Sequence, residues 1–243
     1  MPKIIGIIPA RFASTRFPGK PLIQIKGKSM IQRVYEQCLK AEKLAEVMVA
    51  TDDQRIFEHV QAFGGQVVLT ADSHQSGTDR CAEVIRKLER SFDAVINIQG
   101  DEPFIEPEQI NQVAALLSKP ENRIATLIKA LEKEEDIRNP NVVKAIRTLK
   151  GKAIYFSRSP IPYRRNPEAT ITYFKHVGIY GYHTDVLLEL TLLPQGSLEK
   201  AESLEQLRWI EAGYPIAVEE TTWETISIDT PADLEYVEKL VKS

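Results

Sequence analysis

The sequence predicts an α/β fold in which a mainly parallel sheet carries helices on both faces. Two observations support this prediction. Short, nearly continuous apolar runs, typical of strands that are buried on both faces, recur along the first hundred residues. Segments with helical spacing of their apolar residues separate the runs, and this alternation is typical of a sheet whose strands are joined by helices. The runs are residues 4–8, 47–51, 66–69 and 93–99.

The predicted helices have recognisable ends. Ser29, followed three positions later by Gln32, has the pattern of a capping box at the start of the first helix. Gly64 and Gly65 stop the second helix. The apolar residues that share one face in the three helices are Ile31, Val34, Tyr35, Cys38 and Leu39, then Ile56, Val60 and Phe63, then Cys81, Val84, Ile85 and Leu88.

The pattern changes at about residue 124, where strand-like pieces follow one another without long helices between them. We therefore expect an inserted, partly antiparallel layer over about residues 124–200, within a single domain that spans residues 1–243. The Pro- and Arg-rich stretch 157–167 is expected to be a loop over a site. The expected strands are residues 124–128, 142–147, 153–156, 173–182, 216–219 and 225–228, and the expected later helices are residues 203–212 and 231–241.

Composition narrows the class of protein. The chain has 243 residues, 43% apolar and 27% charged, as expected for a globular domain, and its net charge of −3 does not favour nucleic-acid binding. The longest apolar stretch, residues 4–10, is too short to span a bilayer, so we expect no membrane span, no secretory signal and a cytoplasmic location. Cys38 and Cys81 occupy apolar helix positions, which favours reduced core thiols over a disulfide or a zinc site.

The positive charge is unevenly distributed. Residues 1–30 contain six Lys and Arg residues and no acid, and residues 138–176 contain nine against the single acid Glu168. Such concentration suits the binding of small anions, although chance clustering on a solvated face explains it equally well before motifs are considered.

The first strand is followed by a long loop that is suited to a polyphosphate. Pro9-Ala-Arg-Phe-Ala-Ser-Thr-Arg-Phe-Pro-Gly-Lys-Pro21 is neither of the common glycine-rich phosphate motifs, but it holds three cations, two hydroxyls and a glycine. Arg11 and Arg16 can bind phosphate oxygens through two N–H groups each, whereas Lys20 acts as a mobile point charge. An ordinary basic loop is the alternative, and the absence of acidic partners favours the phosphate site.

Two aspartates are candidates for a metal site. Asp101 follows the apolar run 93–99, and Asp229 follows the expected strand 225–228, so both are expected at the carboxyl edge of the sheet. Two carboxylates together with phosphate oxygens suit Mg²⁺. Taken alone, however, Asp229 is better explained as an acid before a helix, because Thr230 and Asp233 have the pattern of a capping box.

The loop motif resembles the nucleotide-binding loop of the sugar cytidylyltransferases, specifically the 3-deoxy-manno-octulosonate (Kdo) cytidylyltransferase family. Further blocks recur in family order from about residue 4 to 238, and Asp79, where the family has Glu, is a small departure. The resemblance implies a Rossmann-like sheet of the nucleotidyltransferase type A kind. The blocks are His74-Gln-Ser-Gly-Thr-Asp-Arg80, Asn97-Ile-Gln-Gly-Asp-Glu-Pro103, Asn139-Pro-Asn-Val-Val-Lys144, Tyr155-Phe-Ser-Arg158, His176-Val-Gly-Ile-Tyr-Gly-Tyr182, Leu204-Glu-Gln-Leu-Arg208 and Ile228-Asp-Thr-Pro-Ala-Asp-Leu234.

The resemblance also implies roles for individual residues. Asp101 and Asp229 would hold Mg²⁺, and the catalytic set would be these two with Arg11, Arg16 and Lys20. CTP would contact Pro9, Ala10, Arg11, Ser14, Arg16, Lys20, Gln75, Ser76, Gly77 and Arg80. The inserted layer would bind the sugar and form a homodimer, with Kdo in contact with Gln99, Arg158, His176, Tyr180, Glu205 and Gln206.

Several of these residues have simpler explanations from the sequence alone. Arg80 could be a cation on a helix surface, and Arg158 could be an ordinary surface arginine. His176 is typical of a hydrogen-bonded histidine in the core. Gln206, three residues after Ser203, suits a capping box, with Glu205 solvated.

The implied reaction couples Kdo to CTP and gives CMP-Kdo and pyrophosphate for lipopolysaccharide biosynthesis in a Gram-negative bacterium. Catalysis would rest on alignment and charge neutralisation by the cations and Mg²⁺. A cytidylyltransferase for another acidic sugar, such as 8-amino-Kdo, is the nearest alternative, a nucleotide-binding sensor without catalysis is a second, and a nucleic-acid-binding module is the third and least supported.

Overall fold

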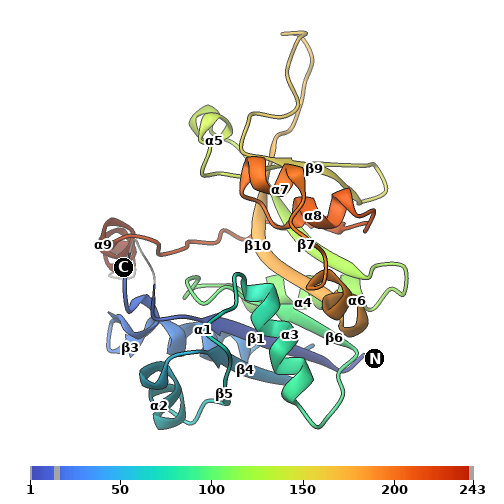
Figure 1. The fold of residues 1–243 in the computed structure, drawn as a ribbon. Coiled ribbons are helices and arrows are strands. Elements are labelled where there is room, and N and C mark those ends of the chain that lie inside the picture. Colours follow the sequence, from blue (N-terminus) through green and yellow to red (C-terminus); the bar gives the residue numbers. More distant parts are fainter. Residues whose placement is uncertain (1, 14–16, 241–243) are drawn as a thin grey trace.

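The computed structural model describes residues 2–13 and 17–240, which fold around one mixed sheet (Figure 1). Its main path has the order β11-β7-β10-β6-β1-β4-β5. The pairs β1 with β4, β1 with β6, β4 with β5 and β7 with β11 are parallel. The strands are β1 (Ile4–Ala10), β4 (Glu46–Thr51), β5 (Val67–Leu69), β6 (Ala94–Asn97), β7 (Ile124–Ala130), β10 (Phe174–His183) and β11 (Ala217–Glu220).

The later strands bring antiparallel pairing into the same sheet. Strand β10 runs antiparallel to both β6 and β7, and the antiparallel pair β8 (Lys144–Arg147) and β9 (Ala153–Ser157) joins the beginning of β10. The expected partly antiparallel region is therefore present, but it extends the main sheet rather than covering it. A small separate ribbon is formed by β2 (Gln24–Ile25) and β3 (Lys28–Ser29).

Helices pack on both faces of the sheet, as predicted. Because side chains alternate along a strand, Ile4 and Ile8 of β1 join one core cluster and Ile5 and Ile7 join the other. The first cluster includes buried residues of α1 (Met30–Cys38), α2 (Gln54–Ala62) and α4 (Pro107–Leu117). The second includes α3 (Gly77–Lys87), α6 (Thr184–Leu190) and α8 (Gln206–Glu211).

The expected helix start at Ser29 is confirmed, because its hydroxyl accepts from the Gln32 N–H at 3.2 Å. The Gln32 side chain donates to Glu36 instead of closing the capping box. Both cysteines are buried free thiols, as predicted. Among the described residues, no helix combines the length and the apolar character that crossing a bilayer requires.

Several elements differ from the sequence prediction. Residues 225–228 do not form a strand, because no strand in the described part of the chain lies beside them to pair with. They lie next to the turn at Asp101, whose carbonyl accepts from the Ile228 N–H at 2.9 Å. The Ser203–Gln206 capping box is wrong, since Ser203 ends α7 in the left-handed region with a φ of 52° and α8 begins only at Gln206. Elements that the prediction missed are η1 (Lys20–Leu22), β2, β3, α4, α5 (Glu134–Arg138), α6 and α7 (Ser197–Glu202).

The loop at 157–167 also lies elsewhere than expected. It belongs to the segment between β9 and β10, which projects from the molecule beyond β9 (Figure 1). Among the described residues, none of those that line the main pocket at the sheet edge comes from this loop.

Glu83 on α3 provides a test of how stability depends on pH. Burial raises the pKa of its carboxyl, but hydrogen bonds from Lys87, the Ala71 N–H and His74 outweigh burial and lower the pKa from 4.5 to about 2. Between these pH values the unfolded chain binds more protons than the folded protein, so this contribution is complete above pH 4.5 and is lost as the pH falls towards 2. We expect Glu83→Gln to lower the unfolding free energy by about 2 kcal/mol at pH 7 and by clearly less at pH 3.5.

Urea unfolding of both proteins at pH 7, 5 and 3.5 measures this difference. Glu121→Gln, at an exposed carboxyl, is the control. A Glu83→Gln deficit that stays constant over this range would contradict the assignment.

Candidate active site

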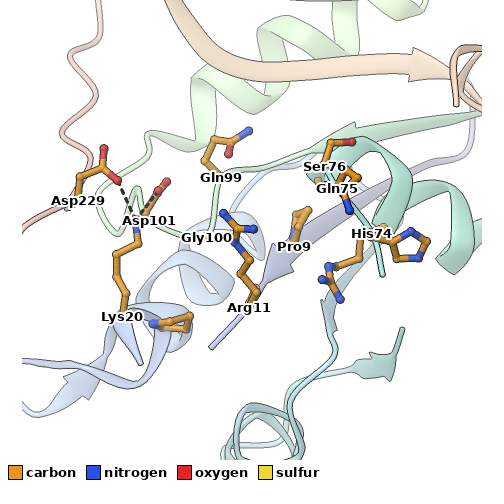
Figure 2. Close-up of a pocket in the computed structure, with 14 residues that line it drawn as sticks. Pro9, Arg11, Lys20, His74, Gln75, Ser76, Gln99, Gly100, Asp101 and Asp229 are labelled. Carbon is orange, nitrogen blue, oxygen red and sulfur yellow. Dashed lines mark hydrogen bonds and ion pairs between the residues drawn. The ribbon is translucent and has the colours of Figure 1, made fainter. Parts of the chain in front are cut away.

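A pocket lies at the carboxyl ends of β1 and β6 and contains most of the residues proposed for CTP (Figure 2). The structure thus brings the N-terminal loop, the start of α3 and the turn after β6 together. Ser14 and Arg16 lie outside the described residues, so their predicted contacts stay predictions. The described lining residues are Pro9, Ala10, Arg11, Lys20, Pro21, His74, Gln75, Ser76, Gly77, Arg80, Gln99, Gly100, Asp101 and Asp229.

Lys20 joins the two candidate metal ligands. Its Nζ lies 2.7 Å from Oδ2 of Asp101 and 3.0 Å from Oδ1 of Asp229 (Figure 2). Gly19 makes this placement possible, because its φ of 71° turns the chain immediately before Lys20 and its N–H donates to the Phe12 carbonyl at 3.0 Å. Residues far apart in the sequence therefore converge on one point, as the sequence analysis expected.

Backbone contacts fix Asp229 beside Asp101. The bond from the Ile228 N–H to the Asp101 carbonyl holds the two segments together. Ile228 is buried in a small cluster with Val237 of α9 (Pro231–Leu240), which anchors the segment from its other side. The predicted Thr230–Asp233 capping box is present, with the Thr230 N–H 2.8 Å from Asp233 Oδ2. Asp233 is thus the acid of that capping box, and the side chain of Asp229 contacts Lys20.

The remaining groups around the pocket are suited to an anion. Arg11 is exposed, and among the described residues its guanidinium has no hydrogen-bond or ion-pair partner. Figure 2 shows it between the Lys20 side and the Ser76 side of the pocket. The N-terminus of α3 faces the same space, where Ser76 and Asp79 form a complete capping box. The positive end of the helix dipole and a free guanidinium both favour phosphate.

Arg80 is buried rather than on the helix surface that the sequence alone allowed. Only 3% of the residue is exposed. Its guanidinium donates to the Thr70 hydroxyl at 2.5 Å and pairs with Asp52 at 3.1 Å. It therefore anchors α3 to the ends of β4 and β5 while lining the pocket.

Gly100 is required by the close approach of two strand ends. A Cβ at this position would lie 2.8 Å from the Pro9 carbonyl oxygen, a backbone atom that cannot move aside easily. We expect Gly100→Ala to lower the unfolding free energy by about 2 kcal/mol, as overpacking does, and to displace Asp101. Urea unfolding measures the first effect, with Gly178→Ala as control, since a Cβ there would meet Gln99 at an ordinary 3.5 Å. Equal losses in the two variants would contradict this account.

Three of the residues proposed for the sugar gather around an irregularity in β10. The pairing of β10 with β7 shifts between Val177 and Tyr180, and the Gln99 side chain donates to the Gly178 carbonyl there at 2.9 Å. The His176 ring packs against Tyr180 at 5.0 Å between centroids and contacts Thr126 Oγ1 at 3.0 Å. Burial lowers the pKa of His176 to about 3, so the imidazole is neutral at pH 7.

A second pocket adjoins the first and shares Gln75 and Ser76 with it. Glu205 lines it and accepts from the Thr78 hydroxyl at 2.8 Å, and burial raises the pKa of the Glu205 carboxyl, so Glu205 is not the solvated residue considered above. Gln206 is buried behind it in α8. The other lining residues, which the sequence analysis did not assign, are Gln195, Glu199, Lys200, Ser203 and Arg208.

Arg158 is not in the first pocket. Its guanidinium donates to backbone carbonyls of Glu202 at 2.7 Å and Pro140 at 3.0 Å, so it ties β9 to α7. Its predicted grip on a sugar carboxylate stays a prediction.

The sequence analysis also missed Pro21 and His74, which line the first pocket, although both lie in the motifs that it used. Glu102 is buried beside Asp101, and burial raises the pKa of its carboxyl to about 8, with the negative charge of Asp101 adding to the effect. Burial of an acid next to a strand end is not visible as a sequence pattern.

The arrangement of the acids fits a metal ion whose coordination is completed by a ligand. Among the described residues, no cluster of three or more His, Cys, Asp or Glu side chains can hold a metal. Asp101 and Asp229 each place a carboxylate oxygen beside the same cation, the Lys20 Nζ. Mg²⁺ commonly combines one or two such carboxylates with phosphate oxygens and water.

Several known proteins are similar to this chain over nearly its full length. The family model described as cytidylyltransferase matches residues 5–226. A 3-deoxy-manno-octulosonate cytidylyltransferase of Cytophaga hutchinsonii is 55% identical, over 95% of this chain and 94% of its own, and one of Bacteroides thetaiotaomicron is 53% identical over 99% of both chains.

Solved structures extend the comparison. A CMP:2-keto-3-deoxy-manno-octonic acid synthetase complexed with CTP is 47% identical, covers 99% of this chain and 98% of its own, and superposes with a TM-score of 0.93. A 4-diphosphocytidyl-2C-methyl-D-erythritol synthase of Anaerococcus prevotii, 14% identical over 99% of both chains with a TM-score of 0.66, shares the fold alone. With a family model that matches most of its length and relatives more than half identical throughout, this chain belongs to the cytidylyltransferase family.

Proposed function

We propose that this chain couples Kdo to CTP, giving CMP-Kdo and pyrophosphate. The observation that carries the proposal is the convergence of Lys20, Asp101 and Asp229 in a pocket that also contains Arg11 and the N-terminus of α3. Relatives about half identical over nearly their full length are named for this reaction, and one solved relative binds CTP.

In this mechanism the anomeric 2-hydroxyl of the sugar attacks the α-phosphorus of CTP in line with the departing pyrophosphate. The protein contributes alignment and charge. Arg11 and Lys20 neutralise the triphosphate, while the N-terminus of α3 orients an anionic group beside Ser76. Gln75 and Ser76 lie at the far side of the pocket from Lys20 (Figure 2), and Arg80 lines the same pocket. These three residues would hold the cytidine part.

We propose Mg²⁺ as the cofactor, held by the carboxylates of Asp101 and Asp229. When bound, it would polarise the phosphate oxygens and lower the pKa of a nearby hydroxyl. His176 is not the general base of this mechanism, because its low pKa reflects a ring packed among aromatic side chains with its Nε2 on Thr126.

The sugar would occupy the second pocket, with Gln99 between the two substrates. Lys200 provides a cation for an acidic sugar there, and Ser203 and Glu205 provide hydrogen-bonding groups for hydroxyls. These groups suit the hydroxylated acid Kdo, and 8-amino-Kdo differs from it by one group.

The decisive experiment incubates the protein with Mg²⁺, each of CTP, UTP, GTP and ATP, and a panel of acidic sugars that includes Kdo and 8-amino-Kdo. Pyrophosphate release and the mass of the product are the readouts. We expect CMP-Kdo with CTP and Kdo. Product only with another sugar would change the substrate, and nucleotide binding without pyrophosphate release would indicate a sensor.

We further propose that the protein acts as a homodimer in the cytoplasm and supplies CMP-Kdo for lipopolysaccharide. The part of the chain from α5 to β9 stands beyond the helix layers of the N-terminal half (Figure 1), where a second copy could contact it. Light scattering during size-exclusion chromatography distinguishes a dimer from a monomer, and a monomer at micromolar concentration would refute this part.

Lys20→Ala is expected to reduce kcat by about a hundredfold, since one positive charge at the reacting phosphates is lost. KM for Kdo should change little. Initial-rate kinetics with saturating CTP measure both parameters, and Lys28→Ala, which removes an exposed lysine paired with Glu36, is the control. Turnover of Lys20→Ala equal to that of the control would remove the proposed role.

A further inference from the structure

Lys20 occupies the position that a metal ion on Asp101 and Asp229 would need. Its Nζ lies within hydrogen-bond distance of one oxygen from each carboxylate, at 2.7 and 3.0 Å. The site is partly shielded, because the side chains of Lys20, Asp101 and Asp229 are 13%, 27% and 34% exposed. The Lys20 ammonium and a metal ion cannot share this position, because their like charges would repel each other strongly.

We propose that Lys20 is an internal counter-cation: it fills the metal site in the nucleotide-free protein and leaves it when the triphosphate binds. The inference rests on the proposed function only in taking the two aspartates as the metal ligands. It makes metal binding dependent on nucleotide, so that the protein alone binds a divalent cation weakly.

The charges favour this exchange. Without nucleotide, the Lys20 ammonium lies against both carboxylates, and a divalent ion that entered beside it would meet a like charge in a shielded site. With the triphosphate bound, the phosphates offer Lys20 a new partner, and its departure removes the like charge that would repel a divalent ion at the two carboxylates.

The local structure lets the side chain move while the backbone stays fixed. The Gly19 N–H is bonded to the Phe12 carbonyl at 3.0 Å, and the Lys20 carbonyl accepts from the Ile23 N–H at 3.2 Å. The four-carbon stem of lysine can redirect its point charge by rotation alone. Lys20 and Arg11 line the same pocket, so a triphosphate bound by Arg11 lies within the space that Lys20 can reach.

The test measures Mn²⁺ binding to nucleotide-free protein by electron paramagnetic resonance, since carboxylate sites for Mg²⁺ also accept Mn²⁺. We expect Lys20→Met to bind one Mn²⁺ at least tenfold more tightly than the wild type. Lys28→Ala removes an equal positive charge at a lysine that pairs with Glu36 and should leave the Mn²⁺ affinity unchanged. Adding Asp101→Asn to Lys20→Met should abolish the gain and thereby locate the new site.

An affinity of Lys20→Met equal to that of the wild type would overturn the proposal, and so would an equal gain in Lys28→Ala, which would indicate a general charge effect. If Lys20→Met does not unfold cooperatively in urea, Lys20→Gln, which keeps a polar side chain without charge, replaces it under the same expectations. The result is independent of the proposed function. Wild-type synthesis of CMP-Kdo without a gain in Lys20→Met refutes only the counter-cation, whereas a gain without synthesis refutes only the reaction.

Discussion

Asp101→Asn is expected to lower kcat by about a thousandfold at saturating CTP, Kdo and Mg²⁺. The substitution keeps the size of the side chain and removes one of the two charges that we propose as metal ligands, and the loss of a preorganised electrostatic partner typically costs a factor of this order. Asp229→Asn should have a similar effect, since its Oδ1 meets the same Lys20 Nζ. Steady-state assays of pyrophosphate release measure both variants.

The double variant provides the sharper test. If the two aspartates hold one ion, removing both should cost little more than removing either, because residues that act as a unit have non-additive effects. Asp72→Asn is the matched control, because Asp72 is an exposed aspartate two positions before His74, and this variant should retain full turnover. Multiplicative losses in the double variant, or a single variant with more than a tenth of wild-type turnover, would contradict a shared ion.

The first half of the fold could be predicted because each of its signals is local. The parallel strands β1, β4, β5 and β6 are continuous apolar runs, and helices α1 to α3 have an apolar stripe with a cap at Ser29 or a glycine stop at Gly64. Helix α4 was missed although its signals are local too, because Glu106, Pro107 and Gln109 form its start and its buried residues Ile110, Val113, Ala114 and Leu117 have the spacing of one helix face. Short helices such as α5 and α7 offer too few turns for periodicity to be recognised.

The site illustrates a different limit. The loop from Pro9 to Pro21 and the acids Asp101 and Asp229 could be found as residue types at strand ends, which is enough to predict that they meet. Their actual contact, through Lys20, depends on how α9 packs and on the bond from Ile228 to Asp101, neither of which is encoded locally. The predicted strand at 225–228 was wrong for the same reason, since an apolar run pairs only where a strand edge is available.

Arg80 is the residue for which sequence reasoning left two roles open, and its substitution should have the largest effect on stability. We expect Arg80→Met to lower the unfolding free energy by about 3 kcal/mol. The substitution removes one partner of a buried ion pair, so the largely buried Asp52 carboxylate keeps its charge without the guanidinium that balanced it. The Thr70 hydroxyl loses a hydrogen bond as well. Urea unfolding at pH 7 without nucleotide measures the change.

A second substitution separates the structural role of Arg80 from its proposed contact with CTP. In Arg80→Met/Asp52→Asn the unpaired charge is gone, so we expect part of the stability to return, as when a buried pair is replaced by neutral side chains. CTP affinity, measured by calorimetry, should not return, because the guanidinium that lines the pocket is still missing. If CTP affinity recovers together with stability, Arg80 serves only to hold α3 against β4 and β5. If stability does not recover, the ion pair with Asp52 is not the source of the stability that the buried guanidinium provides.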